Sequence, residues 1–282
     1  MSLEIPAVEQ AIFPVAGFGT RFLPATKTVP KELLPVLDRP LIDYAVAEAH
    51  QAGIKHIVMV TGRNKSALED YFDYQPELET KLLQSGKLDM IEKINRPLDH
   101  AASISFVRQR EAKGLGHAIW CARDFIDQTK PFAVISPDDL VLHDQGCLRQ
   151  MQDEFKRLGG NLMAVMDVPL EHTNRYGVLS TPNSDSKTPL VTGLVEKPDP
   201  KDAPSTLSII GRYILQPEIF KVLDHLPAGA HNEIQLTDAI TALIGKSPVH
   251  GYRFAGTRFD CGSVDGWLAA NNAYYAHQCA KP

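Results

Sequence analysis

The chain has 282 residues, of which 44% are hydrophobic and 22% charged, so it can form one large α/β domain with a full hydrophobic core. Its formal net charge of −5 argues against a broad nucleic-acid-binding surface, which would need basic stripes. No apolar run reaches the ~18 residues of a membrane span, there is no signal-peptide pattern, and no CxxC pair occurs, so we expect a cytoplasmic protein with no membrane partner and reduced cysteines.

Short apolar runs alternate with amphipathic stretches along the first half of the chain, as in βαβ units around a parallel sheet. A helix is expected over 40–53, because Leu41, Ala45 and Ala49 share one face and Gly53 ends the pattern. A second helix is expected around 116–125. Strands are predicted at 11–16, 56–62, 104–109 and 132–136.

The second half is expected to meander more, with loops at 182–189 and 197–205 where Pro, Asp and Ser are frequent. Strands are predicted at 162–168, 177–180, 191–197 and 205–215, and helices at 233–245 and 264–278. The predicted fold class is α/β, with a Rossmann-like mixed, mainly parallel sheet flanked by helices.

The stretch AGFGTRFLPATKTVPKE, residues 16–32, gathers three cations among glycines and prolines of an acidic chain. A dinucleotide-binding fingerprint fails here, because Phe22 and Pro24 stand where a helix should begin, which disfavours a dehydrogenase. A Walker A loop also fails, since the GKS at 245–247 has Ile240 in place of the first glycine.

A phosphate-binding loop remains the best interpretation of these residues. Small residues at 16, 17 and 19 let backbone N–H groups approach an anion, and Arg21, Lys27 and Lys31 would neutralise a triphosphate. The alternative is a surface turn whose cations pair with Glu32 or Asp38.

The stretch PVAGFGTRFLPATKTVPKELLPV resembles the nucleotide loop of the sugar-phosphate nucleotidylyltransferases, or nucleotide-sugar pyrophosphorylases. The resemblance covers most of residues 11–266 and includes VTGRNKSALEDYFD, VRQREAKGLGHAIWCARD, PDD, YGV, GLVEKP, GRYIL, EIQLTDAI and FDCG. It implies a nucleotide-diphospho-sugar transferase fold in a single domain, 8–282. Its nucleotide-binding half would span about 8–145, its sugar-binding half about 146–260, and a C-terminal helix 264–278.

The resemblance also implies Mg²⁺-dependent transfer of a uridylyl group from UTP to glucose 1-phosphate, giving UDP-glucose and pyrophosphate. Such a reaction needs no general base, because the second phosphate pKa of the sugar phosphate is ~6. Catalysis then depends on positioning two anions and neutralising their charge. Arg21, Lys31, Asp138 and Lys197 are the implied catalytic residues.

Asp138 follows the strand 132–136 at a carboxyl strand end, where α/β sheets place ligands, so its carboxylate can hold Mg²⁺. The alternative by position is a turn or N-cap aspartate. The resemblance selects Asp138 rather than Asp139, which is expected to point elsewhere, and adds Asp260 as a second metal carboxylate.

The Gln109 amide can pair with the edge of a pyrimidine, although a surface glutamine is the alternative. The resemblance places Glu196 on the sugar hydroxyls and Lys197 on the sugar phosphate, where the alternative is an exposed ion pair. Gly177 would allow close approach of the hexose. The implied nucleotide-binding set is Ala16, Gly17, Gly19, Thr20, Lys27, Glu32, Gln109 and Gly114.

Two other functions stay open at this point: a sister enzyme that uses dTTP or CTP, and a non-catalytic nucleotide-sugar-binding regulator. We expect a homo-oligomer, dimer or tetramer, with helix 264–278 as a candidate subunit contact through Trp267, Tyr274 and Tyr275; the alternative is packing on its own domain. His231 and Asn232 depart from the family pattern, where a small residue or an acid is expected.

Overall fold

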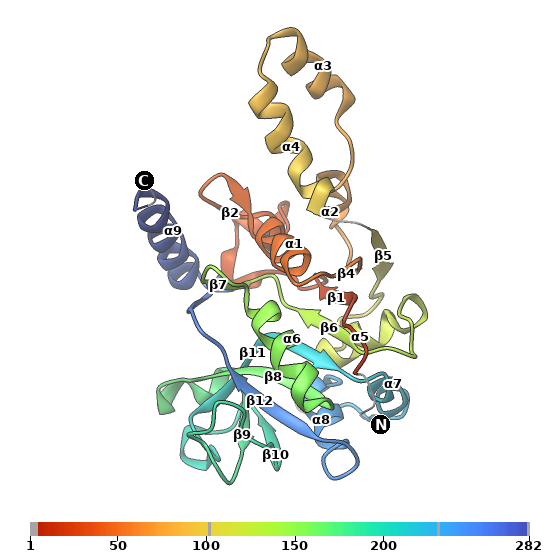
Figure 1. The fold of residues 1–282 in the computed structure, drawn as a ribbon, viewed down its shortest axis with the longest axis vertical. Helices are drawn as coiled ribbons and strands as arrows, with labels where there is room; N and C mark the ends of the chain where they lie inside the picture. Colours follow the sequence, from red (N-terminus) through yellow and green to blue (C-terminus); the bar gives the residue numbers. More distant parts are fainter. Residues whose placement is uncertain (1–4, 101–102, 230–231, 281–282) are drawn as a thin grey trace.

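The computed structural model describes residues 5–100, 103–229 and 232–280 (Figure 1). His231 lies outside the described residues, whereas Asn232 adopts a positive φ of 58°. None of the described helices is long and apolar enough to cross a membrane.

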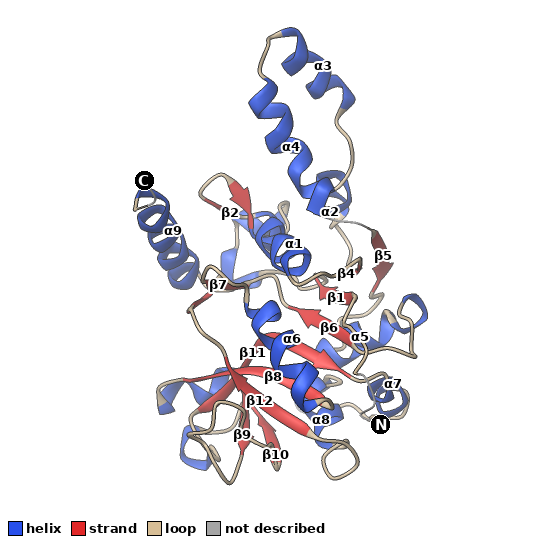
Figure 2. Ribbon diagram, viewed as in Figure 1, coloured by secondary structure: helices blue, strands red, loops and turns tan. Residues whose placement is uncertain are grey.

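A nine-stranded sheet runs through both halves of the chain (Figure 2). Its strands are β1 Gln10–Pro14, β4 His56–Thr61, β5 Ile104–Arg108, β6 Phe132–Ile135, β8 Asn161–Asp167, β9 Gly177–Ser180, β10 Gly193–Glu196, β11 Leu207–Leu215 and β12 Val249–Arg253. Their order is β10-β9-β11-β6-β1-β4-β5, and β8 joins β12 to β11. β10 and β11 run opposite to the other strands of this sheet. The predicted mixed, mainly parallel sheet is confirmed.

Helices cover both faces of the sheet, as the unbroken apolar strands predict. In β1, Ala11 and Phe13 face one core together with the helices α1 Leu41–Gln51 and α6 Cys147–Leu158. Ile12 faces the opposite core with α5 Leu115–Cys121, α7 Glu218–Leu223 and α8 Leu236–Thr241. Because β1, β4, β5 and β6 pair parallel to one another, their carboxyl ends lie at one edge of the sheet.

Residues 233–235 are not helical, although the sequence pattern predicted a helix over 233–245. Ile234 N donates to Lys113 O at 2.8 Å and Ile234 O accepts from Gly116 N at 2.9 Å, so this segment is held extended against the turn before α5. The predicted helix is therefore reduced to α8.

Several elements were not predicted from the sequence. α2 Ser66–Tyr71, α3 Pro76–Gln84 and α4 Leu88–His100 follow β4, and α3 and α4 form an arm at the top of Figure 1. No residue of α3 is buried, so this helix does not pack into the core. α6, α7, β12 and two small ribbons were also missed.

The two ribbons lie beside the large sheet. β2 Pro35–Val36 pairs with β3 Arg39–Pro40, and β7 Asp139–Leu142 pairs antiparallel with β13 Thr257–Asp260. In the second ribbon Asp260 is opposite Asp139. It thus brings together two acidic segments that are far apart in the sequence.

The C-terminal helix α9 Val264–Cys279 packs partly on its own chain. Trp267 Nε1 donates to Pro35 O at 2.9 Å, and the Tyr274 ring lies 5.0 Å from that of Tyr44. Tyr275 is 63% exposed, and Val264 and Leu268 are about half exposed. Only Tyr275, of the three aromatic residues predicted at a subunit contact, is thus left on the surface.

Candidate active site

The loop after β1 forms three short 3₁₀ turns, Thr20–Phe22, Ala25–Lys27 and Lys31–Leu33, in place of a helix. Gly19 precedes the first turn with φ of 65°, a conformation that favours glycine. A Cβ there would lie 3.1 Å from Lys31 Cβ and 3.3 Å from Thr26 Cβ. The glycine therefore allows the two ends of the loop to pack together.

Lys31 pairs across the site with Asp138: Nζ lies 2.6 Å from Oδ2. A Cβ on Gly262 would stand 2.9 Å from Asp138 Oδ2, 3.0 Å from Asp260 Oδ1 and 3.3 Å from Arg21 Nη2. Three predicted residues from distant parts of the chain thus meet around one glycine, and Lys31 joins them through Asp138.

The loop cations do not pair with the acids that a simple surface turn would offer. Glu32 is buried and binds Lys65 at 2.6 Å, and Asp38 pairs with Lys93 at 3.0 Å. Glu32 therefore does not pair with Lys31, and its side chain does not lie on the surface of the loop. Lys27 is exposed and pairs with no carboxylate among residues 5–100, 103–229 and 232–280.

The Lys31–Asp138 pair is charged on both sides. Burial opposes ionisation of Asp138, but the Lys31 ammonium outweighs it and lowers the pKa of this carboxyl. Burial likewise disfavours the Lys31 ammonium, but Asp138 and then Glu32 raise its pKa. A fixed positive and a fixed negative charge therefore face the same space.

Asp139 has contacts of its own, as the sequence analysis expected. Its Oδ2 accepts from Gly211 N at 2.8 Å, and Oδ1 accepts from Arg258 Nε at 2.6 Å. Arg258 also donates to the Tyr176 hydroxyl at 2.9 Å. Asp139 thus supports the wall of the site and leaves Asp138 free to face the loop.

A buried guanidinium supports the turn that carries Asp138. Arg212, which is fully buried, donates to the carbonyls of Ser136 and Asp139 at 2.8 and 2.7 Å. It also binds both carboxylate oxygens of Glu48, at 3.0 and 2.8 Å. The backbone on both sides of Asp138 is therefore anchored to α1.

Asp138 and Asp260 form the best candidate site for a divalent cation. Mg²⁺ in nucleotide sites is held by one or two carboxylates and by substrate phosphates, which suits this donor set. Within the described part of the chain, no group of three or more His, Cys, Asp and Glu side chains could hold a metal on its own. The two carboxylates fit an ion that arrives with phosphate.

Gln109 and Gly114 lie together beyond the end of β5. Gln109 is 8% exposed, and its Nε2 donates to Gly114 O at 3.1 Å. Gly114 has φ of 91°, and a Cβ there would lie 2.8 Å from Glu233 Cβ. His117, which the sequence analysis missed, contacts the Gln109 amide at 3.0 Å through Nδ1.

The residues predicted to bind the sugar line one cavity of about 240 Å³. Glu196 is opposite Gly177 in the sheet register, and Lys197 follows it with φ of 46°. Thr237 Oγ1 donates to Glu196 Oε2 at 3.1 Å, and Lys197 Nζ lies 3.5 Å from Glu196 Oε1. Asp139 also lines this cavity, which therefore adjoins the segment that carries Asp138.

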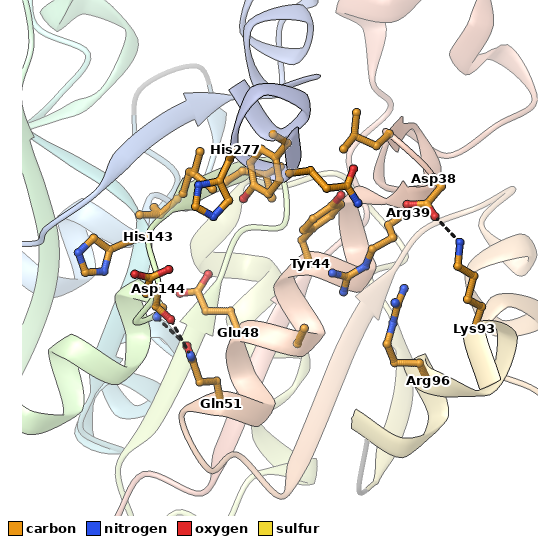
Figure 3. A pocket seen from close by; sticks show the side chains of 18 residues that line it. Asp38, Arg39, Tyr44, Glu48, Gln51, Lys93, Arg96, His143, Asp144 and His277 are labelled. Atoms are coloured by element: carbon orange, nitrogen blue, oxygen red, sulfur yellow. Dashed lines mark hydrogen bonds and ion pairs between the residues drawn. The ribbon is translucent and has the colours of Figure 1, made fainter. Parts of the chain in front are cut away.

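A larger cavity, of about 580 Å³, lies elsewhere (Figure 3). Tyr44, Glu48, Asp144 and His277 are among its lining residues, and none of the predicted site residues lines it. Size alone would therefore misplace the site; the cations, carboxylates and strand ends indicate the smaller cavity instead.

Comparison with known proteins agrees with this geometry. The nucleotidyl transferase family model matches residues 10–277. The chain is 49% identical to a Komagataeibacter xylinus protein named UTP–glucose-1-phosphate uridylyltransferase, over 92% of this chain and 91% of the relative. It is 48% identical to a Bacillus subtilis (strain 168) protein of the same name, over 93% and 89%.

Two solved structures are similar over nearly their whole length. A UDP-glucose pyrophosphorylase complexed with UDP-glucose has a TM-score of 0.87 at 43% identity, with coverage of 96% of this chain and 99% of that one. A UTP-bound UGPase from Acinetobacter baumannii also has a TM-score of 0.87, at 41% identity and with coverage of 95% and 93%. This chain therefore belongs to the nucleotidyl transferase family.

Proposed function

We propose that this chain transfers a uridylyl group from UTP to glucose 1-phosphate, with UDP-glucose and pyrophosphate as products. The observation that supports it best is the meeting of Arg21, Lys31 and Asp138 beside the cavity lined by Glu196 and Lys197. Relatives at 48–49% identity named for this activity agree with it. The first half of the domain would bind the nucleotide and the second half the sugar.

In this reaction an oxygen of the sugar phosphate attacks the α-phosphorus of UTP. The bond from the α-phosphorus to the bridging oxygen breaks, and pyrophosphate leaves with its electron pair. The sugar phosphate needs no base, since its second pKa is ~6. Arg21 and Lys31 would reduce the repulsion between the two anions; their closeness to Asp138 supports this role.

Asp138 and Asp260 would hold Mg²⁺ in this reaction. When bound, the ion would neutralise negative charge on the reacting phosphates. Lys31 fixes the Asp138 carboxylate through its 2.6 Å ion pair. Asp260 Oδ1 accepts from Gly262 N at 3.1 Å, which restrains the second carboxylate.

The nucleotide loop would bind the triphosphate, and Gln109 with Gly114 the uracil. The Gly17 and Gly19 region offers backbone N–H groups, and exposed Lys27 offers a charge. Glu32 would act indirectly, because its carboxylate is buried against Lys65. The other predicted loop residues are Ala16 and Thr20.

Lys197→Ala should raise KM for glucose 1-phosphate about 10- to 100-fold, because a charge-assisted contact to the sugar phosphate is lost. KM for UTP should change little. Initial rates of pyrophosphate release with each substrate varied in turn measure the difference. Lys201→Ala is the control, since Lys201 is an exposed lysine of the next loop. Equal effects on both KM values would assign Lys197 to the nucleotide.

Pyrophosphate release from UTP, dTTP, CTP and ATP with several hexose 1-phosphates tests the proposed function. UTP with glucose 1-phosphate should give the highest kcat/KM. A preference for dTTP or CTP would assign the chain to a sister activity. Nucleotide binding without pyrophosphate release from any pair would identify a non-catalytic regulator.

We also propose a homo-oligomer, dimer or tetramer, with the exposed side of α9 as its contact. Val264, Leu268 and Tyr275 expose 50%, 52% and 63% of their surface, respectively, on this helix. Light scattering of the Tyr275→Glu variant should report a smaller species than the unmodified protein.

A further inference from the structure

The Gln109 side chain is held in one orientation by two neighbours. Gln109 directly follows β5, and its backbone N donates to Thr61 O at 2.8 Å. Its side-chain Nε2 donates to Gly114 O at 3.1 Å and lies 3.0 Å from His117 Nδ1. A carbonyl oxygen can only accept, so the group that faces Gly114 must be the NH₂ end of the amide.

This orientation also fixes the state of the His117 ring. The second N–H of the Gln109 amide faces Nδ1, which must then accept, so the imidazole is neutral with its proton on Nε2. Cys121 Sγ lies 3.8 Å from Nε2, one turn along the same helix. Both amide protons of Gln109 are thereby used within the protein.

Gln109 is left with only its carbonyl oxygen to offer a base. Among the described residues, none donates a hydrogen bond to Oε1. Uracil and thymine carry an N3–H donor on the pairing edge, whereas N3 of cytosine is a bare acceptor. An amide oxygen attracts the first and repels the second.

We infer that His117 is a positioning residue that fixes the Gln109 amide, so that the site accepts pyrimidines with an N3–H group and rejects cytosine. The inference rests on the proposed function, because it takes Gln109 to be the residue that meets the base. The Gln109 oxygen would discriminate CTP from UTP and dTTP, whereas other contacts would have to discriminate between UTP and dTTP.

The surroundings of His117 favour the neutral ring. Burial lowers its pKa most, the nearby Lys113 ammonium lowers it further, and Glu111 opposes them. His117 and Glu111 line the adjacent cavity together with Arg108, Arg110, Trp120, Cys121 and Arg123. Once protonated, Nδ1 would become a donor that faces another donor, and the amide would be driven to turn over.

Binding of UTP and CTP measured by isothermal titration calorimetry tests this inference without requiring turnover. The quantity of interest is the ratio of the CTP to the UTP Kd at pH 8 and pH 5.5. Protonation of the nucleotide phosphates affects both ligands alike and cancels from the ratio. Protonation of cytosine N3 affects only CTP but is common to all variants, so the acid-induced change is compared between the wild type and His117→Gln. The variants are His117→Ala, which has no acceptor, and His117→Gln, whose carbonyl can accept but does not titrate in this range. Cys121→Ala is the control on the same helix.

At pH 8 the ratio should fall about 3- to 10-fold in His117→Ala, the value of one neutral hydrogen bond, and stay near wild type in His117→Gln and Cys121→Ala. The wild-type ratio should fall more on acidification than that of His117→Gln, because only the histidine changes from acceptor to donor. An unchanged ratio in His117→Ala, or a fall on acidification as large in His117→Gln as in the wild type, would overturn the inference. Selective UTP binding without pyrophosphate release would instead overturn the proposed function alone.

Discussion

Asp138→Asn should leave a folded protein whose Mg²⁺-supported turnover falls by at least about 10²-fold. The amide keeps the size of the carboxylate and can still accept from Lys31. It removes the negative charge that Lys31 stabilises and that a divalent cation would need. Pyrophosphate release from UTP and glucose 1-phosphate measures the loss, and circular dichroism checks the fold.

Asp144→Asn is the matched control for this experiment. Asp144 follows β7, the strand that begins just after Asp138, but its side chain lines the larger cavity away from the loop (Figure 3). The turnover of the Asp144→Asn variant should be close to that of the unmodified enzyme. Near-normal turnover in Asp138→Asn itself would refute the metal assignment.

Glu48→Gln should lower the free energy of unfolding by about 3–5 kcal/mol, since it leaves Arg212 buried without a counter-charge. Arg212 is fully buried, and Glu48 is its only carboxylate partner at ion-pair distance in the described chain. Urea denaturation at neutral pH measures the change. Turnover should fall too, because Arg212 anchors the carbonyls of Ser136 and Asp139 on either side of Asp138.

Glu154→Gln gives the comparison for an ion pair at the surface. Glu154 pairs with Arg157 three residues along α6, and the Arg157 side chain is 63% exposed. Such a pair contributes below about 1 kcal/mol because water screens it. If Glu48→Gln lowered the free energy of unfolding as little as Glu154→Gln does, another group would have to compensate the buried charge of Arg212.

The central strands could be predicted to within about two residues because burial on both faces leaves a continuous apolar run. β1, β4 and β6 are of this kind, and candidate site residues were predicted in the segments that follow β1 and β6. The β7–β13 ribbon could not, because four-residue strands carry little pattern and their pairing joins segments more than a hundred residues apart.

The site residues that could be predicted from the sequence are those whose chemical type suits contact with a ligand. The site residues that were missed bind other side chains of the protein instead. Lys65 neutralises buried Glu32, Arg258 holds Asp139, and His117 holds Gln109. Each pairing depends on proximity in the folded chain, which the spacing of residues in one sequence does not reveal. Resemblance to a family supplied Asp260, for which the sequence pattern alone gave no signal.

The β7–β13 ribbon also has a consequence for protein synthesis. Its second strand, which carries Asp260, leaves the ribosome only after all nine strands of the large sheet. A nascent or prematurely released chain could fold its glycine loop around a nucleotide, but it would lack one of the two carboxylates. If Asp260 holds the metal as proposed, copies released before this strand would bind UTP without consuming it.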